Sequence, residues 1–200
     1  MPRGLVYLSF TQSVKWCRFH CMEIGIIMLI IFGGLFVIAI FQNIKNPPRD
    51  IEYEEVPEAV KNVVERLFPD FPRDQVRFAP VRKSYSLKGV YQGDKAEIDL
   101  ELDKKGRLLE FEFEVEKYGS DSFSGNINNI EEIPELVMHL VFSMMDDRDV
   151  APQFISGRNA KFGNAGDKGY RLEFEQANRS YEFKISSEGR LVELEIDWTY

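Results

Sequence analysis

The residues best suited to chemistry are carboxylates that recur at every second position in two segments of the chain. The first segment carries Glu110, Glu112, Glu114 and Glu116, and the second carries Glu193, Glu195 and Asp197. Two carboxylates can hydrolyse a glycosidic bond when they lie in one concave site with different environments. A spacing of two places them instead along one open face of a strand. The pattern therefore indicates a solvated sheet face or, alternatively, a docking surface for a basic partner.

We take six of these carboxylates as the candidate partner-binding residues, and the sequence offers no other site. The six are Glu110, Glu112, Glu114, Glu193, Glu195 and Asp197. Glycine-rich phosphate or dinucleotide motifs and the nucleophile motif of serine hydrolases do not occur in the sequence. The sequence therefore predicts a protein without a cofactor that is not an enzyme.

The other reactive side chains do not form a pattern that predicts a site. His139 lies between two apolar residues of a predicted helix, which is most simply a position at the edge of the helix surface. Cys17, His20 and Cys21 could touch one metal ion from adjacent helical turns, but a fourth ligand is missing nearby. The aspartates at 146–149 lack the glycine turn and the terminal glutamate of a calcium loop. We therefore predict no catalytic residue and no metal site.

Charge is distributed unevenly along the chain. The 200 residues have a formal net charge of −8 at pH 7. Residues 1–49 hold five basic residues against Glu23 alone, which leaves a balance of −12 for residues 50–200. A surface this acidic repels phosphates, so nucleic acid is excluded as a partner. Both cysteines precede residue 22, so the stability of the remaining chain must come from packed cores and not from disulfides.

An uninterrupted apolar segment lies near the N-terminus, where every residue from Ile24 to Phe41 is apolar or glycine. A helix of this length spans about 27 Å, close to the thickness of a bilayer core. The sequence thus predicts a transmembrane helix over residues 24–42. Basic residues before the span place residues 1–23 in the cytoplasm and the rest of this single-pass protein outside the cytoplasmic (inner) membrane. A signal peptide cleaved after Ala39 is the alternative.

The chain after the apolar segment contains an internal repeat. The sequence Val-Pro-Glu-Ala-Val at Val56 returns as Ile-Pro-Glu-Leu-Val at Ile133, 77 positions later. Residues 106–113 return as residues 189–196, 83 positions later, with apolar residues matched to apolar residues. The two offsets differ by an insertion, and the Gly/Asn-rich residues 157–169 have the composition of a loop.

Each copy begins with a predicted helix and continues with predicted strands. Apolar residues such as Val60 and Val64 form a stripe along the first helix. In the strands, apolar residues such as Ile98 and Leu100 alternate with carboxylates, which is typical of an antiparallel sheet covered on one face only. We therefore predict an α+β fold. It consists of two tandem repeats, each a helix packed on an antiparallel meander sheet of about four strands, preceded by one transmembrane helix.

The predicted boundaries follow from these patterns. They are a cytoplasmic segment over 1–23, a transmembrane helix over 24–42, a linker over 43–52, repeat 1 over 53–118, a linker over 119–129 and repeat 2 over 130–200.

The first copy resembles a known family. It has a helix that begins Val-Pro-Glu-Ala-Val and ends near Phe-Pro-Asp, and then the strands Glu-Ile-Asp-Leu-Glu-Leu and Leu-Leu-Glu-Phe-Glu-Phe-Glu around the turn Asp-Lys-Lys-Gly-Arg. This pattern resembles PepSY-like domains, which are similar in fold to the repeat of the beta-lactamase-inhibitor protein. The resemblance covers residues 53–118 well and residues 130–200 in part. It implies an envelope or secreted bacterial protein that binds or restrains another protein, often a peptidase, and it implies no shared catalytic residue.

Three functions are compatible with these patterns. The sequence favours a membrane-anchored extracytoplasmic protein-binding module that restrains or senses an envelope protein such as a peptidase. The alternative is a non-catalytic structural or assembly component of the cell envelope. A hydrolase is the least favoured function, because the carboxylates do not share a concave site.

Overall fold

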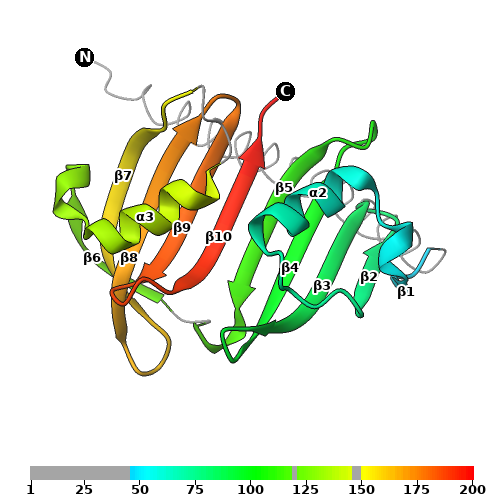
Figure 1. Ribbon diagram of the computed structural model, residues 1–200, viewed down its shortest axis with the longest axis horizontal. Helices are drawn as coiled ribbons and strands as arrows, with labels where there is room; N and C mark the ends of the chain where they lie inside the picture. The colour runs from blue at the N-terminus through cyan, green and yellow to red at the C-terminus, as the bar shows by residue number, and fades with distance from the viewer. Residues whose placement is uncertain (1–45, 119–120, 146–149) are drawn as a thin grey trace, which may run out of the picture. The chain divides into compact units, whose positions relative to one another are not determined.

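The computed structural model describes residues 46–118, 121–145 and 150–200, which form one antiparallel sheet with two helices on it (Figure 1). The first seven strands and helices in chain order are β1 (Arg49–Ile51), η1 (Tyr53–Glu55), α2 (Glu58–Leu67), β2 (Val76–Ala79), β3 (Ser84–Tyr91), β4 (Asp94–Leu102) and β5 (Leu108–Val115). After η2 (Glu116–Tyr118) follow β6 (Asp121–Ile127), η3 (Ile130–Glu132), α3 (Glu135–Met144), β7 (Gln153–Phe162), β8 (Asp167–Gln176), β9 (Arg179–Ser186) and β10 (Leu191–Trp198).

The ten strands pair in the order β1-β2-β3-β4-β5-β10-β9-β8-β7-β6. One succession of elements occurs twice along the chain: a strand, a short 3₁₀ helix, an α-helix and four further strands. The last strands of the two successions, β5 and β10, pair with each other in the middle of the sheet. We call this pairing the β5–β10 seam. It joins the two halves into one continuous sheet.

The predicted fold class is wrong. We expected two separate sheets of about four strands, each under its own helix, behind a transmembrane helix. The structure shows a single, mostly β architecture of ten strands with two short α-helices. The physical reason is that β5 and β10 would each have left a row of unpaired backbone groups at a sheet edge, and their pairing removes both edges. Alternation along a strand shows which side is apolar, but it does not show which strand pairs with which.

The described residues also differ from the predicted single-pass membrane protein. No helix among residues 46–118, 121–145 and 150–200 is long and apolar enough to cross a bilayer. The predicted single-pass membrane localisation is therefore not borne out by the described residues. The span predicted over 24–42, and the cytoplasmic segment over 1–23, lie outside the residues that the structure describes.

Residues 157–169 do not form the predicted loop. Most of them belong to β7 and β8, which form a hairpin with its turn between Phe162 and Asp167. Gly169 lies where the neighbouring strand approaches closely, because a β-carbon there would stand 2.3 Å from the carbonyl oxygen of Ile185. Glycine is needed in a strand when another backbone comes this close. Gly169 therefore serves close packing, whereas Gly163 and Gly166, with φ of 63° and 69°, lie in the turn of the hairpin.

The two edge strands occupy segments that were expected to be linkers. β1 lies within the predicted linker over 43–52, and β6 lies within the predicted linker over 119–129. Six of the seven residues of β6 are exposed, so the strand carries no alternation of apolar and polar residues. An edge strand without a buried face gives no periodic signal in the sequence.

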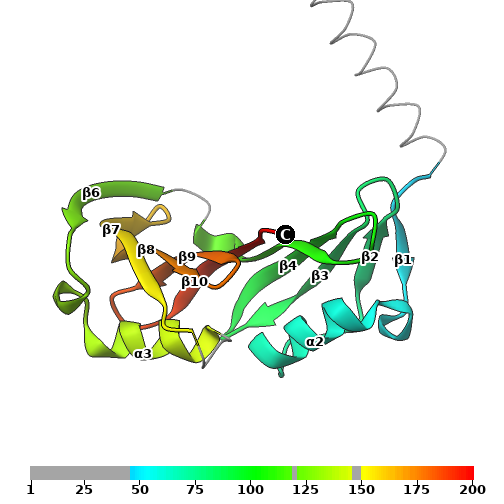
Figure 2. The same cartoon turned by 90° about the horizontal axis from the view of Figure 1, so that it is seen from above.

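Both helices lie on the same face of the sheet (Figure 2). Each begins directly after a proline, Pro57 or Pro134, which lacks the N–H group that would have no partner there. Residues three and four apart turn to the sheet, and these buried positions are Val60, Val64 and Leu67 in α2 and Val137, Val141 and Met144 in α3. The period of the helix thus provides a continuous apolar stripe for each half of the sheet.

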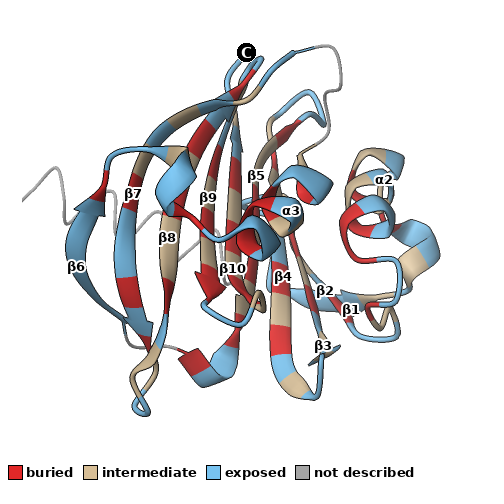
Figure 3. Cartoon of the chain, turned by 60° about the vertical axis from the view of Figure 1, so that its left-hand side comes forward, coloured by how far each residue is buried: buried red, intermediate tan, exposed pale blue. Residues whose placement is uncertain are grey.

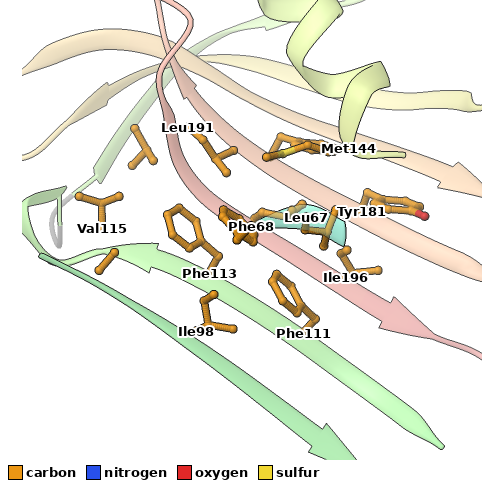
Figure 4. Close-up of a cluster of buried hydrophobic side chains, with 14 of the residues drawn as sticks. Leu67, Phe68, Ile98, Phe111, Phe113, Val115, Met144, Tyr181, Leu191 and Ile196 are labelled. Carbon is orange, nitrogen blue, oxygen red and sulfur yellow. The ribbon is translucent and has the colours of Figure 1, made fainter. Parts of the chain in front are cut away.

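The core lies between this face and the helices. Buried residues alternate with less buried ones along the central strands (Figure 3). Over the seam, Phe68 from the end of α2 stacks on Phe113 and Phe111 at ring-centroid distances of 4.4 Å and 5.9 Å. Met144 from the end of α3 and Ile196 of β10 join this cluster (Figure 4). The apolar side of the seam is thus held by side chains from both halves.

Candidate protein-binding face

The apolar core fixes the direction of the carboxylates on the three central strands. Ile98, Phe111, Phe113, Leu194 and Ile196 are completely buried on the helix side. Successive side chains of a strand point to opposite faces, so the residues between them point away from the helices. We call the nine that are acidic the carboxylate face. They are Glu97, Asp99 and Glu101 of β4, Glu110, Glu112 and Glu114 of β5, and Glu193, Glu195 and Asp197 of β10.

The strand register places these carboxylates directly opposite one another. Across the seam the opposed pairs are Glu110 with Asp197, Glu112 with Glu195, and Glu114 with Glu193. Across β4 and β5 they are Glu101 with Glu110, Asp99 with Glu112, and Glu97 with Glu114. The structure therefore brings all six candidate residues together and adds three from β4. Side chains directly opposite on neighbouring strands have β-carbons about 5 Å apart, and like charges at that distance destabilise the pair.

Tight turns hold the register of β4 against β5 and of β9 against β10. Gly106, with a φ of 80°, donates its N–H to the carbonyl oxygen of Asp103 at 3.0 Å. The Asp103 carboxylate accepts hydrogen bonds from the N–H groups of Lys105 and Arg107 at 2.7 Å and 2.9 Å. Gly189, with a φ of 77°, takes the same place before β10. Because glycine alone adopts this conformation readily, the turns resist slippage by one residue.

Among the described residues, the bases that form ion pairs with the carboxylate face lie at its flanks. On one side, Nζ of Lys88 lies 2.8 Å from Oε2 of Glu97. On the other side, Nζ of Lys184 lies 2.7 Å from carboxylate oxygens of Glu193 and Asp121. Arg171 is farther out and binds Glu182 at 2.6 Å. Among the described residues, the other seven carboxylates of the face form no ion pair within 4 Å.

The position of Glu112 at the centre changes its acidity. The pKa of Glu112 is raised to about 7, mainly by burial and then by the negative charges of neighbours such as Glu193 and Asp99. Burial is also the main cause that raises the pKa of Asp99, Glu110, Glu193 and Glu195. At Glu112 every one of these influences acts against the charged form, so negative charge is least favourable there.

Glu97 shows what a basic neighbour does on the same face. Burial raises the pKa of Glu97, but hydrogen bonds from Lys88 and Ser86 outweigh burial, so the pKa lies below its ordinary value. Glu193 is more deeply buried, and its pKa stays above the ordinary value although Lys184 lowers it. A cation supplied to the centre is thus expected to favour the charged form there, as Lys88 and Lys184 do at the flanks, in competition with burial.

Two open hollows lie on this face, one on each side of the seam. The first has a volume of about 280 Å³, and its lining includes the acidic residues Asp99, Glu101, Glu110 and Glu112 and the basic residue Arg82. The second, of about 220 Å³, includes Glu182, Glu195 and Asp197 together with the exposed Ile155. A larger hollow of about 400 Å³ lies at the β1 edge of the sheet, away from the seam. The carboxylate face thus has hollows into which side chains of another molecule can fit.

The remaining residues singled out in the sequence are placed as follows. His139 is exposed on α3, on the opposite side of the sheet from the carboxylate face. Glu116 begins η2, after the end of β5, and is exposed. Cys17, His20, Cys21 and the aspartates at 146–149 lie outside the described residues. Within the part of the chain that is described, no group of three or more histidine, cysteine or acidic residues is arranged to hold a metal ion.

Sequence reasoning missed the contribution of β4 and of the flanking bases. Glu97, Asp99 and Glu101 alternate in the same way as the residues of β5, and the short turn at Gly106 indicates that the two strands pair. This signal could have added the three residues to the candidates. Lys184 has no comparable signal, because its contact with Asp121 depends on how β6 folds back beside β7.

Comparison with known proteins gives two distant likenesses. No protein-family model matches the chain, and no curated protein matches it. The chain is similar to a solved structure of a DUF2874 family protein from Bacteroides ovatus, with 10% identity over 68% of this chain and 83% of that chain and a TM-score of 0.26. It is also similar to a BLIP-like protein from Bacteroides fragilis, with 14% identity over 68% and 82% of the two chains and a TM-score of 0.25. At such scores, function must be inferred from the geometry of the face itself.

Proposed function

We propose that this chain is a protein-binding module whose carboxylate face holds a basic surface of another protein. The observation that carries the proposal is the set of six acid–acid pairs across β4, β5 and β10, where the described bases that form ion pairs with the face lie at its flanks. Each opposed pair of like charges costs stability in the free protein. A partner that brings lysine or arginine side chains to the centre removes that cost and gains charge-assisted hydrogen bonds.

Charge complementarity also defines the kind of partner. The described half-buried carboxylates are held on rigid strands, so little side-chain freedom is lost when a base binds them. A cluster of basic residues on a folded protein fits this array better than a single charge, since the opposed pairs repeat along both strands. The resemblance to PepSY-like domains implies a peptidase or another envelope protein as the partner, and we propose a partner of this class.

The proposal is tested by first finding the partner and then measuring its affinity. A photo-reactive amino acid at position 114, on the carboxylate face, is compared in intact cells with one at position 188, in the exposed turn before β10. A protein that is cross-linked from position 114 alone is then purified. Its affinity is measured for the wild-type chain, for the face variant E110Q/E112Q/E195Q and for the control variant E54Q/D70N/E188Q, in which three exposed carboxylates elsewhere are neutralised.

Affinities are measured at about pH 8, above the pKa of Glu112, where both variants remove nearly the same negative charge and differ in its position. We expect the face variant to lose about tenfold or more in affinity at low salt and the control variant to lose about twofold or less. Equal losses in the two variants would show that the partner responds to net charge and not to this face. Unchanged affinity in both, with normal folding, would show that the carboxylates of this face do not hold the partner and would overturn the proposal.

A further inference from the structure

Glu112 has acidic neighbours on every strand that packs against it. On β5 itself these are Glu110 and Glu114. On β4, Asp99 stands directly opposite, with Glu97 and Glu101 on either side, and on β10, Glu195 stands opposite, with Glu193 and Asp197 on either side. Both helices cover the other face of the sheet (Figure 2). On the carboxylate face, the described base that shares a hollow with Glu112 is Arg82, from the turn before β3, and no described base forms an ion pair with Glu112 within 4 Å.

Of the eight surrounding carboxylates, the two at opposite flanks are the ones paired with a lysine in the described part of the chain. These are Glu97, with Lys88, and Glu193, with Lys184. Glu112 is half-buried between them, so water screens its charge incompletely. The carboxylate at the centre of such a group is the first to take up a proton as the pH falls, because a proton there relieves repulsion from all of its acidic neighbours.

We propose that Glu112, together with the carboxylates around it, is a pH-sensitive switch that weakens the hold of the face on a basic partner when the surroundings become mildly acidic. This inference rests on the proposed function and adds its regulation. The pKa of about 7 for Glu112 places the change of charge near neutral pH. Above that pH Glu112 is charged and adds to the attraction for bases, and below that pH Glu112 is mostly neutral and adds little.

The switch must act in both directions. If protonation weakens binding of a base, binding of a base must expel the proton to the same extent. A basic ligand bound near neutral pH should therefore release protons into the buffer. Proton release is a readout that a purely structural role of Glu112 would not produce.

Isothermal titration calorimetry on the full chain measures both effects with a peptide of about ten lysines, which stays charged between about pH 6 and pH 8. Titrations in two buffers with different heats of ionisation give the number of protons released. We expect release of about half a proton per peptide near pH 7, and an affinity about three- to fivefold lower at about pH 6 than at about pH 8. E112Q should abolish most of both effects, whereas E188Q, in an exposed turn, should keep them.

The outcomes separate the two proposals. Binding that is weakened by the face variant but not by its charge-matched control, without proton release or pH dependence, overturns the switch and leaves the proposed function intact. The same holds if E112Q releases protons as the wild type does. Equal binding by wild type, face variant and control at every pH overturns the proposed function and the switch with it. A carboxyl carbon of Glu112 that titrates in NMR spectra below about pH 5.5 also overturns the switch, whatever the peptide does.

Discussion

Removing the charge of Glu112 is expected to stabilise the folded protein at alkaline pH. The pKa of this side chain lies at about 7, compared with an ordinary value of 4.5. A difference of that size corresponds to about 3 kcal/mol at full strength. Because the side chain is partly exposed to water, which screens the repulsion, we reduce the expected effect to about 1–2 kcal/mol. E112Q keeps the size and the hydrogen-bonding capacity of the side chain and removes only its charge.

The sign of the effect depends on pH. Below about pH 4.5 the carboxyl group is protonated in the folded and unfolded chains, so Glu112 contributes no penalty. Between about pH 4.5 and 7 the folded chain keeps the proton that the unfolded chain loses, and the stability of the wild type therefore falls as the pH rises. Above about pH 7 the penalty is complete. E112Q should accordingly exceed the wild type in stability by about 1–2 kcal/mol at about pH 8, and the gap should close at about pH 4.

Urea unfolding followed by circular dichroism at the two pH values measures these free energies. E97Q is the matched control, since Glu97 lies on the same face but accepts hydrogen bonds from Lys88 and Ser86. We expect E97Q to be less stable than the wild type at about pH 8 by about 0.5–1 kcal/mol, the opposite sign. The reasoning is refuted if E112Q is no more stable than the wild type at that pH, or if its gain is the same at both.

Three further changes test the packing that supports the carboxylate face. Phe113→Ala, at a side chain with no exposed surface, should lower the free energy of unfolding by about 3–5 kcal/mol, whereas an alanine at the exposed Val90 should change it by less than about 0.5 kcal/mol in the same urea titrations. Gly169→Ala should lower the melting temperature by several degrees, because its new β-carbon would lie 2.3 Å from a carbonyl oxygen of β9. Lys184→Met should speed hydrogen exchange of the amides of β6, since it removes the 2.7 Å contact with Asp121; unchanged exchange would mean that this ion pair does not hold the edge strand.

Local features of the sheet could be read from the sequence because they depend on neighbours in the chain. The alternation of Ile98 and Leu100 with carboxylates located β4 and showed which side is buried. The stripe containing Val60 and Val64 located α2 in the same way. Each pattern reflects the period of one element, and burial of its apolar side follows directly.

Features that depend on distant segments could not be read in this way. The pairing of Glu112 with Glu195 joins residues 83 positions apart, and no local pattern encodes which edge of a meander meets which. Gly169 suggested a loop because close approach of the strand at Ile185 is invisible in composition. The exposed residues of β6 likewise gave no period. The sequence therefore placed the candidate carboxylates along one face of each strand, but it did not show that the strands pair and bring them together.

The central claim is that the opposed carboxylates of the carboxylate face, on β4, β5 and β10, hold a basic partner. The most direct test is the ratio of two affinities for the partner cross-linked from position 114, measured at low salt for E110Q/E112Q/E195Q and for the charge-matched E54Q/D70N/E188Q. We predict that the face variant binds about five- to tenfold more weakly than its control. Added salt should lower the affinity of the wild-type chain until it approaches that of the face variant. Equal affinities of the two variants would contradict the account.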